Sequence, residues 1–253
     1  MSNVSISTNS LTIGYRAQGA LSRVQTDLHF ALEQGEMVCM LGPNGCGKSS
    51  LLRTLAGLQP ALSGEYMIQK SGVKVQDSKA IALVLTERLS MDNTTVHDVV
   101  ALGRYPYSSF LDGLKAEDEA IIDDALRQVG FADAQTVASS FFNAHSDGEK
   151  QRILIAKALA QQTPIILLDE PTAHLDLPHR ILILRLLRRL AHEQKKTILI
   201  STHELDLALA LSDRILLMTP GKGVLLDTAA NLKKSDAFTS AFSMDIFHPL
   251  GEE

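Results

Sequence analysis

The chain has 253 residues, 45% of them hydrophobic and 21% charged, which is typical of a globular protein with room for one large domain. Its net charge of −5 argues against a protein that coats nucleic acid, because such proteins are usually basic. The longest uninterrupted apolar run, residues 80–85, falls far short of the roughly 20 residues of a membrane span, and the N-terminus lacks the pattern of a signal peptide.

The first half of the chain predicts a strand, a glycine-rich loop and a helix in immediate succession. Residues 36–41 form a short apolar strand, residues 42–49 read GPNGCGKS, and residues 50–56 predict a helix that ends at Gly57. The two cysteines, Cys39 and Cys46, fall in the strand and in the loop. A disulfide is therefore not expected, and a reducing cytosol fits.

The rest of the chain is first rich in helices and then alternates between strands and helices. Strands are predicted at 81–85, 165–168, 197–201 and 215–218, and helices at 95–103, 117–129, 146–160, 181–191 and 204–211. The alternation predicts an α/β fold with a parallel sheet. We expect one domain over residues 1–253, with a core formed by 1–88 and 158–253 and a helical subdomain inserted at 89–157.

The glycine-rich loop fits the pattern G-x-x-x-x-G-K-[ST] and lies in the context that the pattern requires, after a strand and before a helix. Its glycines let backbone N–H groups turn inward around phosphate groups, and the helix N-terminus faces the same oxygens. Lys48 is expected to reach the β- and γ-phosphates of a nucleotide, and Ser49 to offer its hydroxyl to Mg²⁺. Cys46 occupies a variable position of the pattern and is interpreted as a residue that fills space there, not as a redox switch.

Two carboxylates follow the apolar strand at 165–168. We expect Asp169 to hold Mg²⁺, directly or through water, and Glu170 to orient or deprotonate an attacking water. Successive strand residues point to opposite faces, so the two acids can have different roles. His203 follows the next predicted strand, at the edge where parallel sheets bind ligands, and is expected to contact the γ-phosphate and the attacking water.

With these motifs in order, the chain resembles the ATP-binding subunit of ABC transporters over nearly its whole length. Residues 146–152, SDGEKQR, stand where that family has its signature, and residues 173–176 resemble its D-loop. His203 matches the switch histidine, and Tyr15 matches the aromatic residue that stacks on adenine. The resemblance implies an α/β fold of the P-loop NTPase (RecA-like) class, with a mostly parallel sheet, an N-terminal antiparallel β part and an inserted helical subdomain.

The resemblance also implies that the chain binds ATP and Mg²⁺, with Glu170 and His203 as catalytic residues and Ser49, Asp169 and Glu87 as metal ligands. The nucleotide contacts it implies are Tyr15, Gly42, Pro43, Asn44, Gly45, Cys46, Gly47, Lys48, Ser49, Ser50, Ser146, Asp147, Gly148 and Glu149. The family works as a head-to-tail homodimer, in which each ATP lies between one phosphate loop and the partner's signature.

The family's dimer drives an integral-membrane permease, which is expected to dock near Glu87 and Asp92. The resemblance thus implies a peripheral protein at the cytoplasmic face of the inner membrane, without direct contact with the cargo and without a nucleic-acid partner. Within the family, residues 99–107 and the acidic pair at 117–118 resemble the subunit that energises import of ferric siderophores, haem or cobalamin.

Two positions depart from the commonest family pattern. The signature usually begins Leu-Ser-Gly-Gly-Gln, whereas this chain reads His145-Ser-Asp-Gly-Glu, and the family's glutamine near residue 85 is replaced by Glu87. Asp147 and Glu149 resemble the iron-chelate branch. A carboxylate at 87 can still bind Mg²⁺, and His145 can weaken packing below the loop or titrate near neutral pH.

Three alternatives remain open. A P-loop kinase or RecA-like motor would lack the signature helix. A soluble ABC ATPase of DNA repair or translation would carry a long coiled coil or two cassettes, and neither is found. A weakly catalytic, ATP-gated scaffold is kept open by Glu87 and His145. The arginines on the helix after Pro178 are interpreted as a solvated face rather than a nucleic-acid surface; they are Arg180, Arg185, Arg188 and Arg189.

Overall fold

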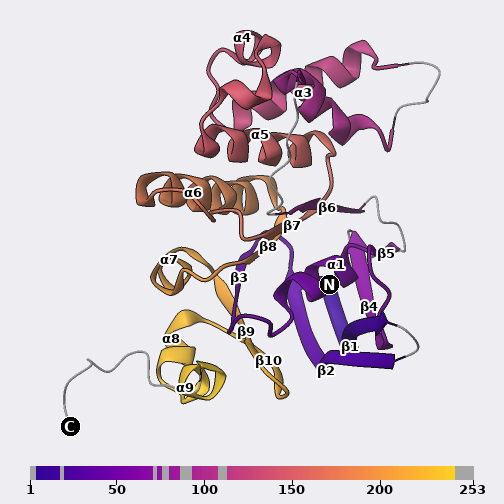
Figure 1. Ribbon diagram of the computed structural model, residues 1–253, viewed down its shortest axis with the longest axis vertical. Coiled ribbons are helices and arrows are strands. Elements are labelled where there is room, and N and C mark those ends of the chain that lie inside the picture. Colours follow the sequence, from indigo (N-terminus) through magenta and orange to yellow (C-terminus); the bar gives the residue numbers. More distant parts are fainter. Residues whose placement is uncertain are drawn as a thin grey trace.

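The computed structural model describes residues 4–17, 20–70, 73–75, 80–85, 93–107 and 113–242. A six-stranded sheet in the order β10-β9-β3-β8-β7-β6 crosses the molecule (Figure 1). Its strands are β3 (Met37–Leu41), β6 (Ile81–Val84), β7 (Ile165–Asp169), β8 (Thr197–Ser201), β9 (Arg214–Thr219) and β10 (Gly223–Asp227). All neighbours pair in parallel except β10 with β9.

The central strands β3, β7 and β8 are buried along their whole length, and their apolar runs are what a parallel sheet covered on both faces requires. β8 lies between β3 and β7, with Ser201 in register with Met40 on one side and Asp169 on the other. The carboxyl ends of three strands therefore meet at one edge of the sheet. The loops that leave this edge carry the residues of interest.

A second, four-stranded antiparallel sheet has the order β2-β1-β4-β5. It consists of β1 (Val4–Ala17), β2 (Ala20–Glu33), β4 (Ser63–Lys70) and β5 (Val73–Val75). Buried residues of β1 and β2, such as Ile13 and Leu28, share a core with Leu51 of α1 (Lys48–Leu55) and with Met40 of β3. This packing places the antiparallel sheet beside the loop that precedes α1.

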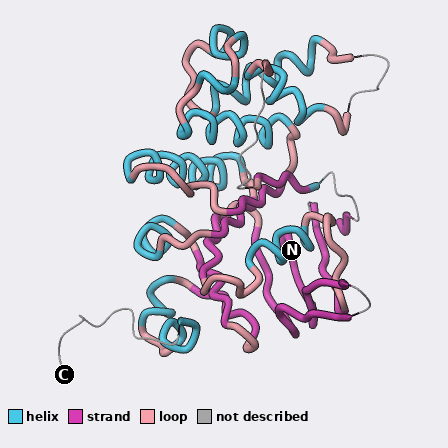
Figure 2. Tube along the Cα trace, in the orientation of Figure 1, coloured by secondary structure: helices cyan, strands magenta, loops and turns pink. Residues whose placement is uncertain are grey.

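A helical part lies between β6 and β7 in the sequence and forms one end of the molecule, apart from the strands (Figure 2). It contains α2 (Val96–Ala101), η2 (Leu102–Arg104), α3 (Ala116–Gln128), α4 (Ala134–Ser139), η3 (Phe142–Ala144) and α5 (Asp147–Ala160). Arg104 donates to Asp118 over 2.8 Å and to the carbonyl of Ala160, so a buried ion pair joins η2, α3 and the end of α5.

The helix α6 (Leu177–Gln194) lies between this helical part and the central sheet, whereas α8 (Ala229–Lys233) and α9 (Ala237–Phe242) lie at the opposite end (Figure 1). The short helix α7 (Leu205–Leu211) follows β8. Among the described residues, no helix is long and apolar enough to cross a membrane.

The predicted elements are present, and most differences concern their ends. α1 already begins at Lys48, because Gly47, with φ of 107°, ends the loop and leaves the lysine in the first helical turn. Gly103 lies inside η2 and does not close the preceding helix as predicted. The helix predicted at 146–160 ends at Ala160, as expected.

Candidate active site

The loop between β3 and α1 contains two glycines, Gly42 and Gly47, at which an added side chain would meet neighbouring atoms. A Cβ on Gly42 would lie 2.6 Å from the carbonyl oxygen of Met218, and one on Gly47 would lie 2.7 Å from Val24 Cγ1. Both glycines have positive φ values, 154° and 107°. The loop therefore packs tightly against β9 and β2, and it continues directly into the start of α1.

Lys48 is only 6% exposed, and its ammonium group donates to the carbonyls of Gly42 at 2.9 Å and Pro43 at 3.2 Å. Both partners are uncharged, and among the described residues Lys48 makes no ion pair. A buried ammonium group without a counter-ion is costly. The loop thus presents a positive charge and a helix N-terminus at the same place, which suits an anion such as a phosphate.

Two side chains from the antiparallel sheet support the loop. Gln25 on β2 is 1% exposed, and its Nε2 donates to the carbonyls of Cys46 and Thr219, each at 3.0 Å. The hydroxyl of Tyr15 on β1 is hydrogen-bonded to Ser50 on α1, while the residue as a whole remains 46% exposed. Tyr15 was predicted near the nucleotide. Gln25 was missed, since a single polar residue in a strand carries no sequence signal.

The two acids at the end of β7 lie in different local structures. Asp169 is the last residue of β7 and accepts a hydrogen bond of 2.6 Å from the Ser201 hydroxyl. Glu170 has a φ of 47°, in the left-handed region, and its N–H donates to the Ser201 Oγ at 2.9 Å. The argument from strand alternation was therefore wrong for Glu170, because the chain turns at that residue instead of continuing as a strand.

His203 and Glu170 contact each other directly, as His203 Nε2 is hydrogen-bonded to a carboxylate oxygen of Glu170. Both side chains are partly exposed, at 43% and 32%. The prediction brought these residues to the same edge but placed a water between them. The structure places the two side chains in direct contact, and the attacking water stays a prediction.

The start of α5 is held by a capping box. Ser146 accepts from the N–H of Glu149 at 3.4 Å, and Glu149 accepts from the N–H of Ser146 at 3.0 Å and from its hydroxyl at 2.7 Å. These bonds from Ser146, hydroxyl first and N–H second, hold the pKa of Glu149 below its usual range. The predicted capping function is confirmed by this geometry.

His145, which departs from the family pattern, is packed rather than loose, and its side chain is 13% exposed. Its Nε2 lies 2.7 Å from the Ser140 hydroxyl, which itself donates to the carbonyl of Val137, so the ring donates to Ser140. The ring also lies edge-on to Phe131, with centroids 6.3 Å apart. The expectation that His145 weakens packing below the loop is not supported by these contacts.

Residues 173–176 form the turn that leads into α6. His174 has a φ of 67°, and Asp176 caps the helix by accepting from the N–H of His179 at 3.2 Å. The imidazole and then the N–H of His179 hold the pKa of Asp176 below its usual range. Glu87 and Asp92, the expected metal ligand and permease contact, lie outside the described residues.

The family model for the ABC transporter matches residues 25–173, more than half of the chain. The chain belongs to the ABC transporter family. Its ATP-binding relatives include the achromobactin transport ATP-binding protein of Dickeya dadantii, 38% identical, covering 83% of this chain and 77% of that protein. The iron(3+)-hydroxamate import ATP-binding protein of Bacillus subtilis is 35% identical, covering 95% of this chain and 88% of that protein.

Solved ABC structures have the same fold. A metal-chelate type ABC transporter in an inward-facing conformation matches with a TM-score of 0.82 and 30% identity, covering 95% of this chain and 90% of that one. A dimeric ABC cassette in a post-hydrolysis state, bound to ADP and phosphate, matches with a TM-score of 0.73 and 25% identity, covering 88% and 98%. The chain is thus an ATP-binding ABC ATPase with a P-loop NTPase fold.

The candidate site suits a metal ion that is bound together with a nucleotide, and not a metal ion held by protein side chains alone. Among the described residues, no group of three His, Cys, Asp or Glu is placed to hold a metal ion. Magnesium commonly takes one or two protein oxygens and completes its shell with phosphates and water. The Asp169 carboxylate at the end of β7 and the Ser49 hydroxyl in the first turn of α1 are oxygen donors of that kind.

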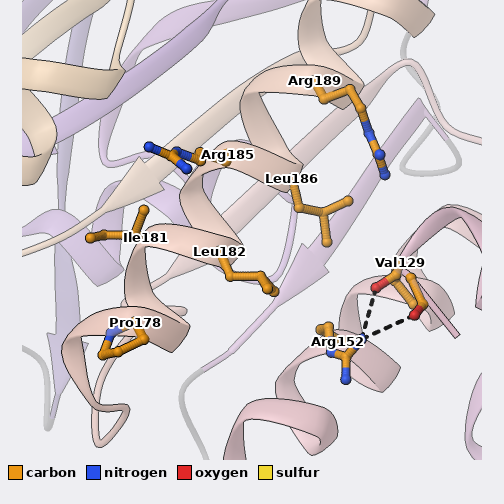
Figure 3. Close-up of a pocket in the computed structure, with 9 residues that line it drawn as sticks. Val129, Arg152, Pro178, Ile181, Leu182, Arg185, Leu186 and Arg189 are labelled. Atoms are coloured by element: carbon orange, nitrogen blue, oxygen red, sulfur yellow. Dashed lines mark hydrogen bonds between the residues drawn. The ribbon is translucent and has the colours of Figure 1, made fainter.

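A groove of about 520 Å³ lies in the cassette between α6 and the helical part (Figure 3). It is lined by Val129, Gly130, Arg152, Pro178, Ile181, Leu182, Arg185, Leu186 and Arg189. Arg189 donates to the carbonyl of Gln128 at 2.7 Å, and Arg180 donates to that of Leu175 at 2.6 Å. The four arginines of α6 were expected to form a solvated face; Arg185 and Arg189 are exposed and Arg180 and Arg188 are partly exposed.

Proposed function

We propose that this chain is the ATP-hydrolysing subunit of a membrane importer for a ferric siderophore or a related iron or tetrapyrrole chelate. The observation that carries the proposal is the meeting of the phosphate loop, the Asp169–Glu170 pair and His203 at one edge of a parallel sheet. The import branch is supported by the names of relatives, which include achromobactin, iron(3+)-hydroxamate and cobalamin transport or import proteins.

In the proposed site, the loop from Gly42 to Ser50 binds the triphosphate, and Tyr15 stacks on the adenine. When a phosphate enters, Lys48 exchanges its two carbonyl partners for anionic oxygens, which gives stronger, charge-assisted hydrogen bonds. Ser49, Asp169 and Glu87 hold Mg²⁺, which neutralises charge on the phosphates when bound.

Glu170 acts as the general base, and His203 positions the water and the γ-phosphate. Their direct hydrogen bond links the two residues before substrate is bound. For turnover this bond opens, the Glu170 carboxylate accepts a proton from the attacking water, and His203 donates to the substrate. The two side chains are partly exposed, so neither is locked in place by packing.

The proposed working unit is a head-to-tail homodimer. In Figure 1, α1 lies beside the antiparallel sheet and α5 in the helical part, so the phosphate loop and the signature of one chain occupy different regions. Ser146 to Glu149 then meet the ATP held by the partner. The N-terminal end of α5 favours a negative charge at that position.

Dimer closure is coupled to a permease through residues near Glu87 and Asp92. We place the protein at the cytoplasmic face of the inner membrane, as a peripheral subunit that touches neither cargo nor nucleic acid. Ligands shift such an equilibrium only by their different affinities for the open and closed states. In this proposal, ATP favours the closed dimer, and hydrolysis removes the γ-phosphate that joins the two subunits.

The proposal is tested by capturing the partner of a Glu170→Gln variant on membranes with ATP and identifying it. The matched control is Glu193→Gln, which changes an exposed glutamate on α6 away from the candidate site. Recovery of a polytopic permease with Glu170→Gln and ATP, and its loss without ATP, supports the proposal. A DNA-repair or ribosomal partner would contradict it.

A further inference from the structure

His179 lies in the first turn of α6 and is held by the residue that caps this helix. Its Nδ1 is hydrogen-bonded to the Asp176 carboxylate, which also accepts from the His179 backbone N–H at 3.2 Å. Because a carboxylate only accepts, Nδ1 carries the proton. One edge of the imidazole is thereby fixed to the turn at residues 173–176.

The opposite edge of the same imidazole lies against the start of α5. A Cβ built on Gly148 would lie 2.7 Å from His179 Cδ2, 3.1 Å from Cγ and 3.4 Å from Nε2. Gly148 is buried, and Ser146, two residues before it, is the N-cap of the helix. The absent side chain at 148 is therefore what lets the ring approach the backbone of the signature.

We propose that His179 is a positioning residue that couples the signature at 146–149 to the turn at 173–176. This inference rests on the proposed dimer, in which the signature meets the ATP held by the partner subunit. The His179 ring lies beside the backbone of Gly148 and is hydrogen-bonded to Asp176, so the side chain bridges the two segments.

Two physical features favour such coupling. The ring lies so close to the backbone at Gly148 that it leaves no room for a side chain there. The Asp176 carboxylate accepts from both the helix N–H and the imidazole, so it holds the ring in that orientation. A movement of the signature on meeting a partner's nucleotide is therefore passed to the turn before α6.

The contacts of His179 can be separated by substitution. His179→Ala removes both contacts. His179→Phe keeps a ring against Gly148 but loses the hydrogen bond to Asp176, and His179→Asn keeps an amide donor for Asp176 but loses the ring edge. The matched control is His192→Ala, which removes another partly exposed histidine of α6 that is bonded to a carboxylate, in this case Asp213.

All variants are made in the Glu170→Gln background, and the ATP concentration for half-maximal dimerisation is measured by sedimentation velocity. ADP affinity of the monomer is measured alongside. Coupling predicts that His179→Ala raises the ATP midpoint about 5- to 100-fold, in the range of known coupling energies, while ADP affinity stays within about twofold. His179→Phe and His179→Asn each show most of the increase, and His192→Ala shows none.

The outcomes are distinguishable. An unchanged ATP midpoint in His179→Ala overturns the inference, even if the variant is less stable. A midpoint restored by either His179→Phe or His179→Asn also overturns it, because coupling requires both contacts. If the Glu170→Gln parent itself fails to dimerise with ATP, the proposed function is wrong. If the parent dimerises and the His179 variants have the same ATP midpoint as the parent, the His179 inference fails and the proposed function stands.

Discussion

The imidazole Nε2 of His203 is hydrogen-bonded to the carboxylate of Glu170 across two adjacent parallel strands. The two residues follow β8 and β7, and their contact occupies the place where an attacking water is needed. The proposed base and its neighbour are thus engaged with each other in this structure.

Replacing this base should remove chemistry but not binding. We expect Glu170→Gln to lower the turnover number about 10²- to 10⁴-fold, because general base catalysis contributes that much, while ATP affinity stays within about twofold. Phosphate release under saturating ATP and a binding isotherm measure the two quantities, with Glu193→Gln as the control. Turnover at the wild-type rate would show that Glu170 is not the base.

Lys48 is expected to matter for affinity. Lys48→Ala removes a buried ammonium group, and hydrogen bonds to charged groups contribute about 1.5–3 kcal/mol, so ATP binding should weaken at least about tenfold. Isothermal titration calorimetry measures the change, and Lys222→Ala, which alters an exposed lysine bonded to Ser240, is the control. Unchanged affinity in Lys48→Ala would remove the basis of the phosphate-loop assignment.

The choice of residue at position 148 should be restricted by the neighbouring His179 side chain and not by the backbone conformation. Its φ is not positive, and alanine is about 1 kcal/mol better than glycine inside a helix. Gly148→Ala should nevertheless destabilise the protein, because the new methyl group meets His179. In a His179→Ala background the same change should be neutral or stabilising. Urea unfolding of the four proteins tests this reversal of sign, and equal effects in both backgrounds would contradict it.

The loop thiol should be unreactive in the folded protein. Burial raises the pKa of the Cys46 thiol, and burial raises that of Cys39 to about 12, so little thiolate is present at neutral pH. We expect iodoacetamide to modify both cysteines rapidly only in denaturant, with Cys46 reacting before Cys39 in the native protein. Intact and peptide mass spectrometry follow the reaction. Modification of native Cys46 at the rate of a free thiol would contradict the buried loop.

The capping box at α5 should weaken in acid. The pKa of Glu149 is lowered in the folded state by Ser146, so its carboxylate stabilises the fold above its ordinary value of 4.5 and this contribution is lost as the pH falls through the lowered pKa. The difference in unfolding free energy between wild type and Glu149→Gln should be constant between about pH 5 and pH 7 and shrink below that range. A difference that does not change in acid would contradict the assignment.

Much of this fold could be predicted because its signals are local. The strand from Ile165 to Asp169, the capping box of Ser146 and Glu149, and the glycine loop each lie within one short segment of sequence. Hydrophobic runs, capping residues and glycine spacing act over one or two turns or one strand. These features therefore appear in the structure close to their predicted bounds.

The features that could not be predicted depend on segments distant in sequence or on one unusual backbone angle. Gln25 meets the loop at Cys46 and Thr219, and His179 meets Gly148 from a separate helix; such pairs are set by tertiary packing. Glu170 adopts a left-handed backbone conformation, which is uncommon for glutamate and is not predicted by its residue type. No single-sequence pattern encodes these contacts.

A single hydroxyl group, that of Ser201, is hydrogen-bonded to both acidic residues at the end of β7. Ser201 donates to Asp169 and accepts from the N–H of Glu170, and it does so from the next strand of the sheet. The orientation of the Asp169 carboxylate and of the Glu170 backbone thus depends on the alignment of two strands. Drift in surface loops leaves these two hydrogen bonds intact, whereas a one-residue slip of β8 along β7 would break them without altering either acid.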